Sequence, residues 1–449
     1  MKQYIFLVED IVNNRPVTLI EKIYSSVFSK NRIEYVSLPN FDETANILNS
    51  ELYKTIKFVK VLDFIKHVGV GEISSDYEVY YFISTLHSLQ TFHWMNLLGL
   101  DVEVIDFLKK HKIPVIIDSA MEITHPSDFS FIGTFTKIFN KGLDITESDK
   151  CYRGIEKLDF IVVHPMYRPL AEQNNYFLKI KNIKNVMFPT PFFYLRPLLL
   201  KEIIENRESL FESIKNKKIT ESTPQWIAYS YTQRYSRMLF FMRAHVENLI
   251  KNKGKYSLLL PMRDVFRNFC SLNNKELLWI TEEALDILDN IKVLDEIYGP
   301  IKKPIKEIVP KKHVENIWYN IVLETFDHRI EDNEDLDMHT MLTEKTAKAI
   351  IEGLPFLHFG GKDHIKLLKH YGFELYPDLN FPADKNLYRN LDQVIEKMKY
   401  LDNLSISDKN KLNDEWKEII MYNYDHYTKI NASQLYIDSL KGIYKPIFE

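Results

Sequence analysis

MLTEKTAKAIIEGLPFLHFGGKDHIKLLKHYGF, residues 341–373, contains two expected helices with a short apolar run between them. Thr343 precedes a charged pair and an apolar run, which is typical of a helix start because the hydroxyl can accept from an exposed amide of the first turn. We therefore expect a helix over 343–352 and a second one over 362–371. The run LPFLHFG at 354–360 predicts a buried strand, so the whole stretch is typical of a sheet covered by helices.

The segment before Thr343 predicts a strand that leads into this helix start. NIWYNIVLETF at 316–326 is apolar and ends near Glu324, and an acidic loop follows it. A strand, a loop and a helix start can form a phosphate cradle, because first-turn amides and the positive end of the helix dipole attract an anion. Lys345 adds a positive charge there, and GG at 360–361 would let backbone approach a ligand. The alternative is a solvated helix start without a ligand.

The rest of the chain alternates short apolar runs with helical stretches, which indicates parallel sheets covered on both faces. KYSLLLP at 255–261 opens a second α/β segment, and FELY at 373–376 is a further candidate strand. The stretch QWIAYSYTQRYSRMLFFMRAHVENLIKN is interpreted as a buried helix with solvent-facing Arg234 and Arg237. The alternative is that Gln233, Arg234 and Arg237 line a cleft between the lobes. In the first 200 residues the expected strands are QYIFLV, RIEYVSL, EVYYFIS, IPVIID, LDFIVVH and NVMFPT.

This pattern predicts an α/β protein with two Rossmann-like lobes. In open α/β sheets, ligands bind beyond the carboxyl ends of the strands, so residues at those ends are candidates for a site. The expected parts are an N-terminal lobe over 1–197, a helical connection over 198–254, a C-terminal lobe over 255–400 and C-terminal helices over 401–449 that pack back toward the N-terminal lobe.

Length and composition fit two domains and exclude some classes of protein. The chain has 449 residues, of which 45% are hydrophobic, and a formal net charge of −4, which gives no global basic field for a nucleic acid. Its two cysteines, Cys151 and Cys270, lack the spacing of a metal site. The apolar run near the N-terminus is too short for a signal peptide or a membrane span, so we expect a cytoplasmic protein without membrane contact.

The string TEKTAKAIIEGLPFLHFGG, with ET before it and LLKHYGFELY after it, resembles the C-terminal lobe of sugar-nucleotide glycosyltransferases common in bacteriophage genomes. There the string is similar to a T-E-K-T-x-K-x-I-x-x-G-x-P-F signature. A similar helix start is found in fucosyltransferases of the two-Rossmann, or GT-B, type. The resemblance is specific over about 320–376, looser over 255–270 and architectural over the first 200 residues.

The resemblance implies a donor site in the C-terminal lobe. Lys345 matches the lysine that contacts the donor diphosphate, and Glu344 matches the acid that binds the ribose hydroxyls. Arg263 is implied as a second phosphate contact, with Arg267 behind it. Three further residues complete the predicted donor-binding set, namely Thr343, Thr346 and Glu324. The acidic and tyrosine motif that the family carries after GF is not recognisable here, which leaves recognition of the donor sugar open.

The implied reaction moves a sugar from a UDP- or GDP-linked donor to an acceptor hydroxyl, with no cofactor besides the donor. Fixed cations and helix amides that face the leaving diphosphate lower the barrier, and we assign no metal. The first lobe would supply the base, for which Asp118 is the first choice and His93 the second. His164, Glu9 and Asp10 are alternatives. The acidic loop at 331–337 contains Asp335 and Asp337 in a DxD pair, which we interpret as a solvated loop. The alternative is a Mg²⁺ or Mn²⁺ site of the kind that DxD pairs form in the other main architecture of glycosyltransferases.

The acceptor and the oligomeric state stay open. The phage resemblance favours a modified DNA base, such as a hydroxymethylpyrimidine, and the host cytoplasm as the location. A glycan or another surface component is the alternative acceptor. Lysine-rich segments at 250–255 and 301–313 could contact DNA phosphates. A rival hypothesis from another class is a non-catalytic binding protein that keeps the fold without turnover.

Overall fold

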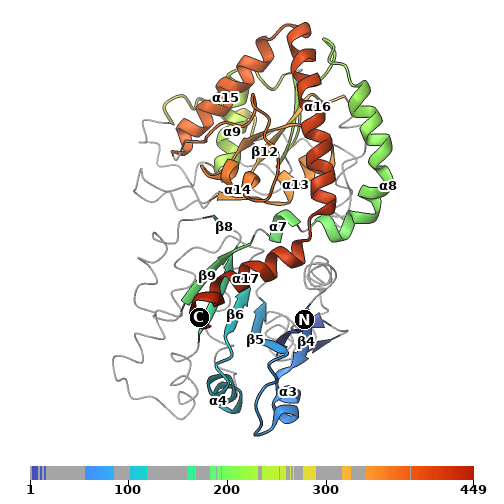
Figure 1. Cartoon of the computed structure of the whole chain (residues 1–449). Helices are drawn as coiled ribbons and strands as arrows, with labels where there is room; N and C mark the ends of the chain where they lie inside the picture. The colour runs from blue at the N-terminus through green and yellow to red at the C-terminus, as the bar shows by residue number, and fades with distance from the viewer. Residues whose placement is uncertain are drawn as a thin grey trace, which may run out of the picture. The chain divides into compact units, whose positions relative to one another are not determined.

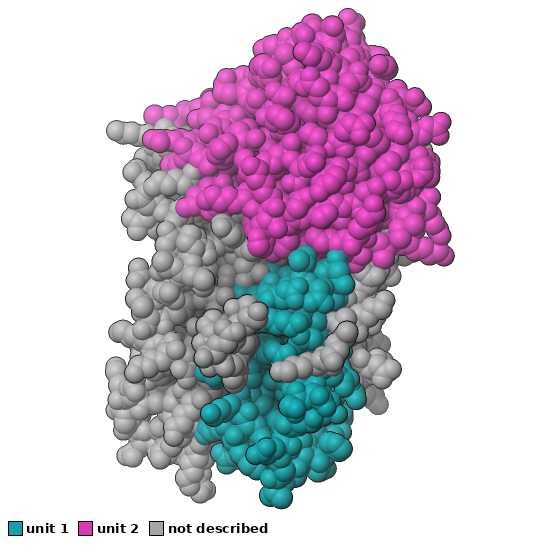
Figure 2. All heavy atoms as spheres, viewed as in Figure 1, with its two compact units in different colours: residues 1–191, 431–449 teal, residues 192–430 magenta. Residues whose placement is uncertain are grey.

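The computed structural model is an α/β protein with two parallel sheets (Figure 1). The chain divides into two compact units, of which unit 1 comprises Met1–Pro191 with Asn431–Glu449, and unit 2 comprises Phe192–Ile430 (Figure 2). The structure describes residues 3–8, 11–12, 15–16, 56–84, 102–118, 159–164, 166–167, 183–188, 190–193, 195–230, 235–251, 253–258, 263, 266, 277–289, 316–324, 340–384 and 386–448.

Unit 1 contains a six-stranded sheet in which every neighbouring pair of strands is parallel. Five of its strands were predicted from their apolar runs, and the edge strand β4 was not. The predicted strand RIEYVSL lies outside the described residues. In spatial order the strands are β4 (Ile56–Lys60), β1 (Gln3–Val8), β5 (Tyr77–Ser84), β6 (Val115–Asp118), β7 (Phe160–His164) and β9 (Ile183–Met187).

The strands of unit 1 are apolar along most of their length, as expected for a parallel sheet that is covered on both faces. Phe6 in β1 stacks on Phe82 in β5 with 5.0 Å between the ring centroids. Tyr436 packs edge-on against Phe188, which follows β9, at 5.1 Å. The described part of unit 1 also contains three short strands and three helices, namely β2 (Ile11–Val12), β3 (Arg15–Pro16), β8 (Met166–Tyr167), α3 (Val61–Val68), α4 (Val102–Lys110) and α17 (Ala432–Phe448). The short helix α7 (Thr190–Phe193) begins in unit 1 and ends in unit 2.

Unit 2 contains a four-stranded parallel sheet whose strand order reverses once. The chain forms β10 first, then β11 on one side of it, and then β12 and β14 on the other side. The reversal therefore falls between β10 and β12, where ligands of open parallel sheets bind. In spatial order the strands are β11 (Gly254–Leu258), β10 (Trp226–Ser230), β12 (Tyr319–Leu323) and β14 (Phe356–Phe359).

Two groups of helices pack in unit 2, as expected when both faces of a sheet are covered. One group comprises α8 (Leu195–Asn216), α13 (Glu344–Ile351) and α16 (Ile406–Lys429). The other comprises α9 (Tyr235–Val246), α11 (Glu282–Asp286) and α15 (Leu387–Asn403). The remaining elements are α14 (His364–His370) and β13 (Thr340–Met341). None of the helices in the described part of the chain combines the length and apolar character that a membrane span needs.

The structure corrects the prediction of a continuous helix through QWIAYSYTQRYSRML. Trp226–Ser230 form the strand β10, which is buried throughout and paired on both sides, and the helix begins only at Tyr235. A buried run of five residues is too short for its periodicity to distinguish a strand from a helix. The neighbouring strand carries Gly254 opposite Trp226, where a Cβ atom would lie 2.2 Å from the indole ring.

The prediction of a strand at FELY, residues 373–376, was wrong, because the side chain of Asn423 bonds to this backbone where a strand partner would. The Glu374 amide donates to Asn423 Oδ1 at 2.8 Å, and Asn423 Nδ2 donates to the Glu374 carbonyl at 2.9 Å. The segment therefore pairs with an asparagine of α16 and forms no ladder. The expected strands around β11, β12 and β14 and the expected helices around α13 and α14 are confirmed.

Candidate functional site

The candidate site lies at the carboxyl edge of the sheet in unit 2, where the strand order reverses. Glu324 follows β12 directly, and α13 begins beside it. The helix start agrees with the prediction, since Thr343 is the N-cap residue and its hydroxyl accepts from the Lys345 amide at 3.2 Å. Two polar elements thus meet at the position where parallel sheets bind ligands.

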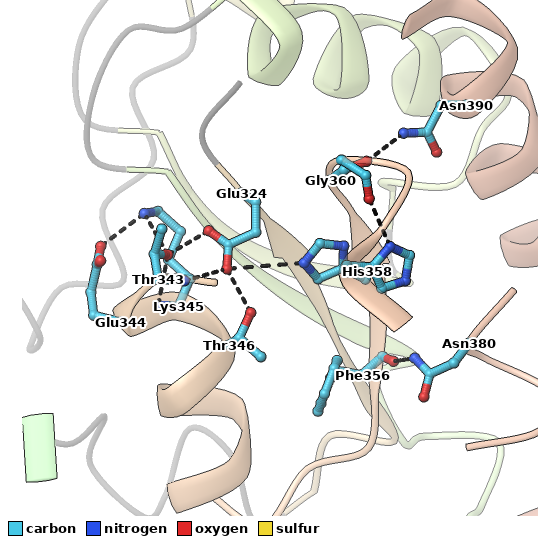
Figure 3. Close-up of polar contacts among 12 residues, drawn as sticks. Glu324, Thr343, Glu344, Lys345, Thr346, Phe356, His358, Gly360, Asn380 and Asn390 are labelled. Atoms are coloured by element: carbon cyan, nitrogen blue, oxygen red, sulfur yellow. Dashed lines mark hydrogen bonds and ion pairs between the residues drawn. The ribbon is translucent and has the colours of Figure 1, made fainter. Parts of the chain in front are cut away.

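The anion at the start of α13 is the carboxylate of Glu324 (Figure 3). Its Oε1 accepts from the Thr343 amide at 2.9 Å and from the Thr346 hydroxyl at 2.6 Å. Its Oε2 accepts from the Thr343 hydroxyl. Because a helix N-terminus stabilises negative charge, this buried carboxylate satisfies donors that the sequence offered to a phosphate.

Glu324 is buried with only 1% of its surface exposed, and its protonation reflects opposing effects. Burial raises the pKa of the carboxyl above its ordinary value, while the Lys345 ammonium and the hydroxyls of Thr343 and Thr346 act in the opposite direction. Burial is the largest of these effects, so the pKa of Glu324 is raised overall. Because its oxygens are bonded to the helix start and its side chain is buried, Glu324 is closed to a direct contact with a ligand.

Glu344 and Lys345 form an ion pair on the solvent side of this helix start. Lys345 Nζ lies 2.8 Å from Glu344 Oε1 and 3.3 Å from the Thr343 hydroxyl oxygen. The lysine side chain is 17% exposed and that of Glu344 is 42% exposed. Burial acts to raise the pKa of Glu344, but the charge and hydrogen bond of Lys345, a backbone hydrogen bond and the charge of Arg237 together hold it below its ordinary value. The Glu344 carboxylate is therefore charged at neutral pH, and both side chains are partly exposed to solvent.

Arg237 contributes a second positive charge, and its position corrects the interpretation as a solvent-facing arginine. It lies in the first turn of α9, with only 1% of its surface exposed. Its charge also acts to lower the pKa of Glu344, so the starts of α9 and α13 are electrostatically linked. Sequence reasoning did not place Arg237 at the carboxyl edge, because the strand β10 before its helix was not predicted.

The structure does not bring Arg263 to Lys345 through any described contact. Its guanidinium instead bonds to Asp286 at 3.1 Å, and also to Glu282 and Asp289. The side-chain hydrogen bonds to Asp289 and Glu282 raise the pKa of Arg263 above its usual range. A phosphate would have to displace these carboxylates, so we leave Arg263 out of the site. Arg267 lies outside the described residues.

Two buried histidines lie on the other side of Glu324. The rings of His358 and His364 stack with centroids 4.0 Å apart, and His358 Nε2 is 4.0 Å from Glu324 Oε1. Burial lowers the pKa of His358 well below its ordinary value, and that of His364 to about 4. Both rings are therefore neutral near pH 7. Sequence reasoning missed this pair, because a histidine within an apolar strand resembles ordinary core.

The GG turn after β14 is explained by His358 and not by a ligand. A Cβ atom on Gly360 would lie 1.9 Å from His358 Cε1, so only glycine fits above the ring. The Gly361 carbonyl lies 3.0 Å from His364 Nδ1, and Asn390 Nδ2 donates to the Gly360 carbonyl at 2.8 Å. The sequence predicted a close approach of this backbone to a ligand; in the structure the turn lies close to the histidine pair.

The candidates for a base lie in unit 1 or outside the described residues. Asp118 is the last residue of β6, in register with Ser84 and Val163, and its side chain lies outside the described part. His164 ends β7, and its side chain is likewise not described. Three other predicted features lie outside the described residues, namely His93, the Glu9–Asp10 pair and the acidic loop at 331–337.

Comparison of the chain with protein-family models and with curated proteins gives no match. We therefore argue function from the geometry at α13 together with the resemblance of its sequence.

Proposed function

We propose that the chain is a glycosyltransferase that moves a sugar from a nucleotide-sugar donor to an acceptor hydroxyl. In this proposal units 1 and 2 are the two Rossmann-like lobes of a GT-B enzyme, and unit 2 binds the donor. The observation that carries the proposal is the start of α13, where the Glu344–Lys345 pair is placed at the order reversal of a parallel sheet. A nucleotide diphosphate suits this position, because it combines an anion with ribose hydroxyls.

The two side chains of the pair have separate roles in donor binding. Lys345 contacts the diphosphate and stabilises the charge that grows on it as the bond to the sugar breaks. Glu344 accepts hydrogen bonds from the ribose hydroxyls, because its lowered pKa keeps it an acceptor at neutral pH. Arg237 adds positive charge near Glu344. Donor binding would replace the contact between Lys345 and Glu344 with one contact to each part of the nucleotide.

The acceptor side of the reaction belongs to unit 1. Asp118, at the carboxyl end of β6, is the proposed base that takes the proton from the acceptor hydroxyl. The proposed acceptor is a hydroxymethylated DNA base, with a glycan or surface component as the alternative. A base hydroxyl within a duplex would be reached by flipping the nucleotide out of the stack.

A screen of donors tests this proposal. We would incubate the protein with UDP- and GDP-sugars, with and without hydroxymethylated DNA, and follow free nucleotide and sugar transfer by mass spectrometry. Lys345→Ala should abolish most turnover, whereas Lys201→Ala, on a side chain 88% exposed in α8, should leave it unchanged. Nucleotide binding without transfer or donor hydrolysis would favour the non-catalytic alternative. Equal turnover in both variants would contradict the assigned site.

A further inference from the structure

We propose that Glu324 is a positioning residue that fixes the first turn of α13 and thereby aims Glu344 and Lys345 at the donor. This inference rests on the proposed function. It differs from the prediction that Glu324 contacts the donor, because the carboxylate is buried and both of its oxygens already accept hydrogen bonds from α13.

The geometry restrains the turn on both sides of the pair. Thr343 and Thr346 flank Glu344 and Lys345 in the chain, and each donates its hydroxyl to the same carboxylate. The Thr343 amide adds a third hydrogen bond at 2.9 Å. Glu344 and Lys345 therefore project from a short segment whose two ends are both bonded to the Glu324 carboxylate. Side chains that are held in place before binding lose less conformational entropy when the ligand binds.

A carboxylate suits this position better than a neutral amide. Three donors converge on it, and an ionised carboxylate is an acceptor only, with room for several hydrogen bonds. A glutamine would direct its own NH₂ toward a hydroxyl that donates. The positive end of α13 and the Lys345 ammonium both compensate the buried negative charge.

His358 offers the carboxylate a second partner on the side away from α13. Its Nε2 lies 4.0 Å from Glu324 Oε1, and within the described part of the chain neither ring nitrogen has a hydrogen-bond partner. The other charged or titratable groups that act on the carboxylate are Lys345 and Glu344 from α13, and His364 faces His358 from α14. If one threonine hydroxyl is lost, Glu324 can turn toward His358 and release the helix start.

The test compares two substitutions at Thr346, because Glu324→Gln places a mismatched amide in the core and could fail to fold. Thr346→Ser keeps the hydroxyl donor, and Thr346→Val removes it with little change of shape. By calorimetric titration with UDP and GDP, we expect Thr346→Val to bind about tenfold more weakly than wild type and Thr346→Ser to bind within about twofold of it. Hydrogen exchange should be faster for the first-turn amides of α13 in Thr346→Val alone.

The outcomes separate this inference from the proposed function. If Thr346→Val binds and exchanges like Thr346→Ser while Lys345→Ala loses affinity, the positioning role of Glu324 is overturned and the donor site stands. If wild type binds neither nucleotide, the proposed function fails and takes the inference with it. If Thr346→Val alone weakens binding and loosens the first turn, both are supported.

Discussion

Lys345 and Arg263 were predicted to hold the same diphosphate, yet their surroundings differ. Among the described residues, Lys345 has one carboxylate at contact distance, and that carboxylate is itself a proposed ligand group. Arg263 is bonded to three carboxylates on and beside α11. A cationic side chain in a matching motif can therefore bind an anion only when neighbouring carboxylates do not already occupy its hydrogen-bond donors. The local sequence does not contain those partners.

The α13 start and the cluster around Arg263 also differ in how far their charged groups are buried. The α13 start connects to buried groups, since Glu324 joins the threonine hydroxyls on one side and approaches the histidine pair on the other. The three carboxylates around Arg263 are 45–74% exposed, although the Arg263 side chain is only 21% exposed, so solvent and salt screen each ion pair. Substitutions at the first region should therefore change stability more than substitutions at the second.

Removing the buried carboxylate should have the largest effect. Glu324→Ala leaves the Thr343 amide and two hydroxyls without their acceptor, so we expect the free energy of unfolding to fall by about 3 kcal/mol. Urea denaturation measures it, with Glu282→Ala at the exposed cluster as the matched control. A loss in Glu324→Ala no greater than in the control would show that the α13 start does not depend on this carboxylate.

A pH dependence of stability should come from the histidine pair. The folded chain holds His364 neutral with a pKa of about 4 against an ordinary 6.5, and burial also lowers the pKa of His358 well below its ordinary value. As the pH falls below 6.5 the unfolded chain takes up protons that the folded chain does not, so stability falls toward pH 4. For His364 alone the loss amounts to about 3 kcal/mol at the acid end of this window.

His364→Asn is the matched variant for this measurement, because its amide can still donate to the Gly361 carbonyl but does not titrate. Denaturation at several values between pH 7 and pH 4 should give a shallower decline for His364→Asn than for wild type. Parallel curves for the two proteins would mean that this ring carries no such linkage.

Breaking the exposed cluster should have the smallest effect. In Arg263→Ala, three carboxylates lose a partner, but each can be solvated where it stands. We expect the melting temperature to stay close to that of wild type, and any difference to shrink further as salt is added. A large, salt-independent drop would place Arg263 among the buried structural groups and would remove the contrast with the α13 start.

Much of the fold of the described part could be predicted from its sequence, because apolar runs and capping residues are local signals. Thr343 marked the start of α13, and IPVIID marked β6. β10 was missed, since its short buried run continues into an apolar helix and no local feature separates them. β4 was missed because it leads into α3 without a turn residue.

The site could be predicted only where its parts are local. The Glu344–Lys345 pair and the helix start lie within four residues, so their proximity followed from the helix itself. The partners of Arg263 lie 19 to 26 residues along the chain, and those of Glu324 lie 19 to 34 residues away. Such contacts depend on tertiary packing, which the spacing of residue types does not encode.

The most direct test of the donor site is a calorimetric titration of wild type, Lys345→Ala and Arg263→Ala with UDP and GDP. A charge-assisted contact to phosphate contributes about 1.5–3 kcal/mol, so Lys345→Ala should weaken binding roughly ten- to a hundredfold. Arg263→Ala should bind as tightly as wild type. Equal affinity in wild type and Lys345→Ala, or a loss confined to Arg263→Ala, would contradict the account and leave the start of α13 a capped helix held by Glu324.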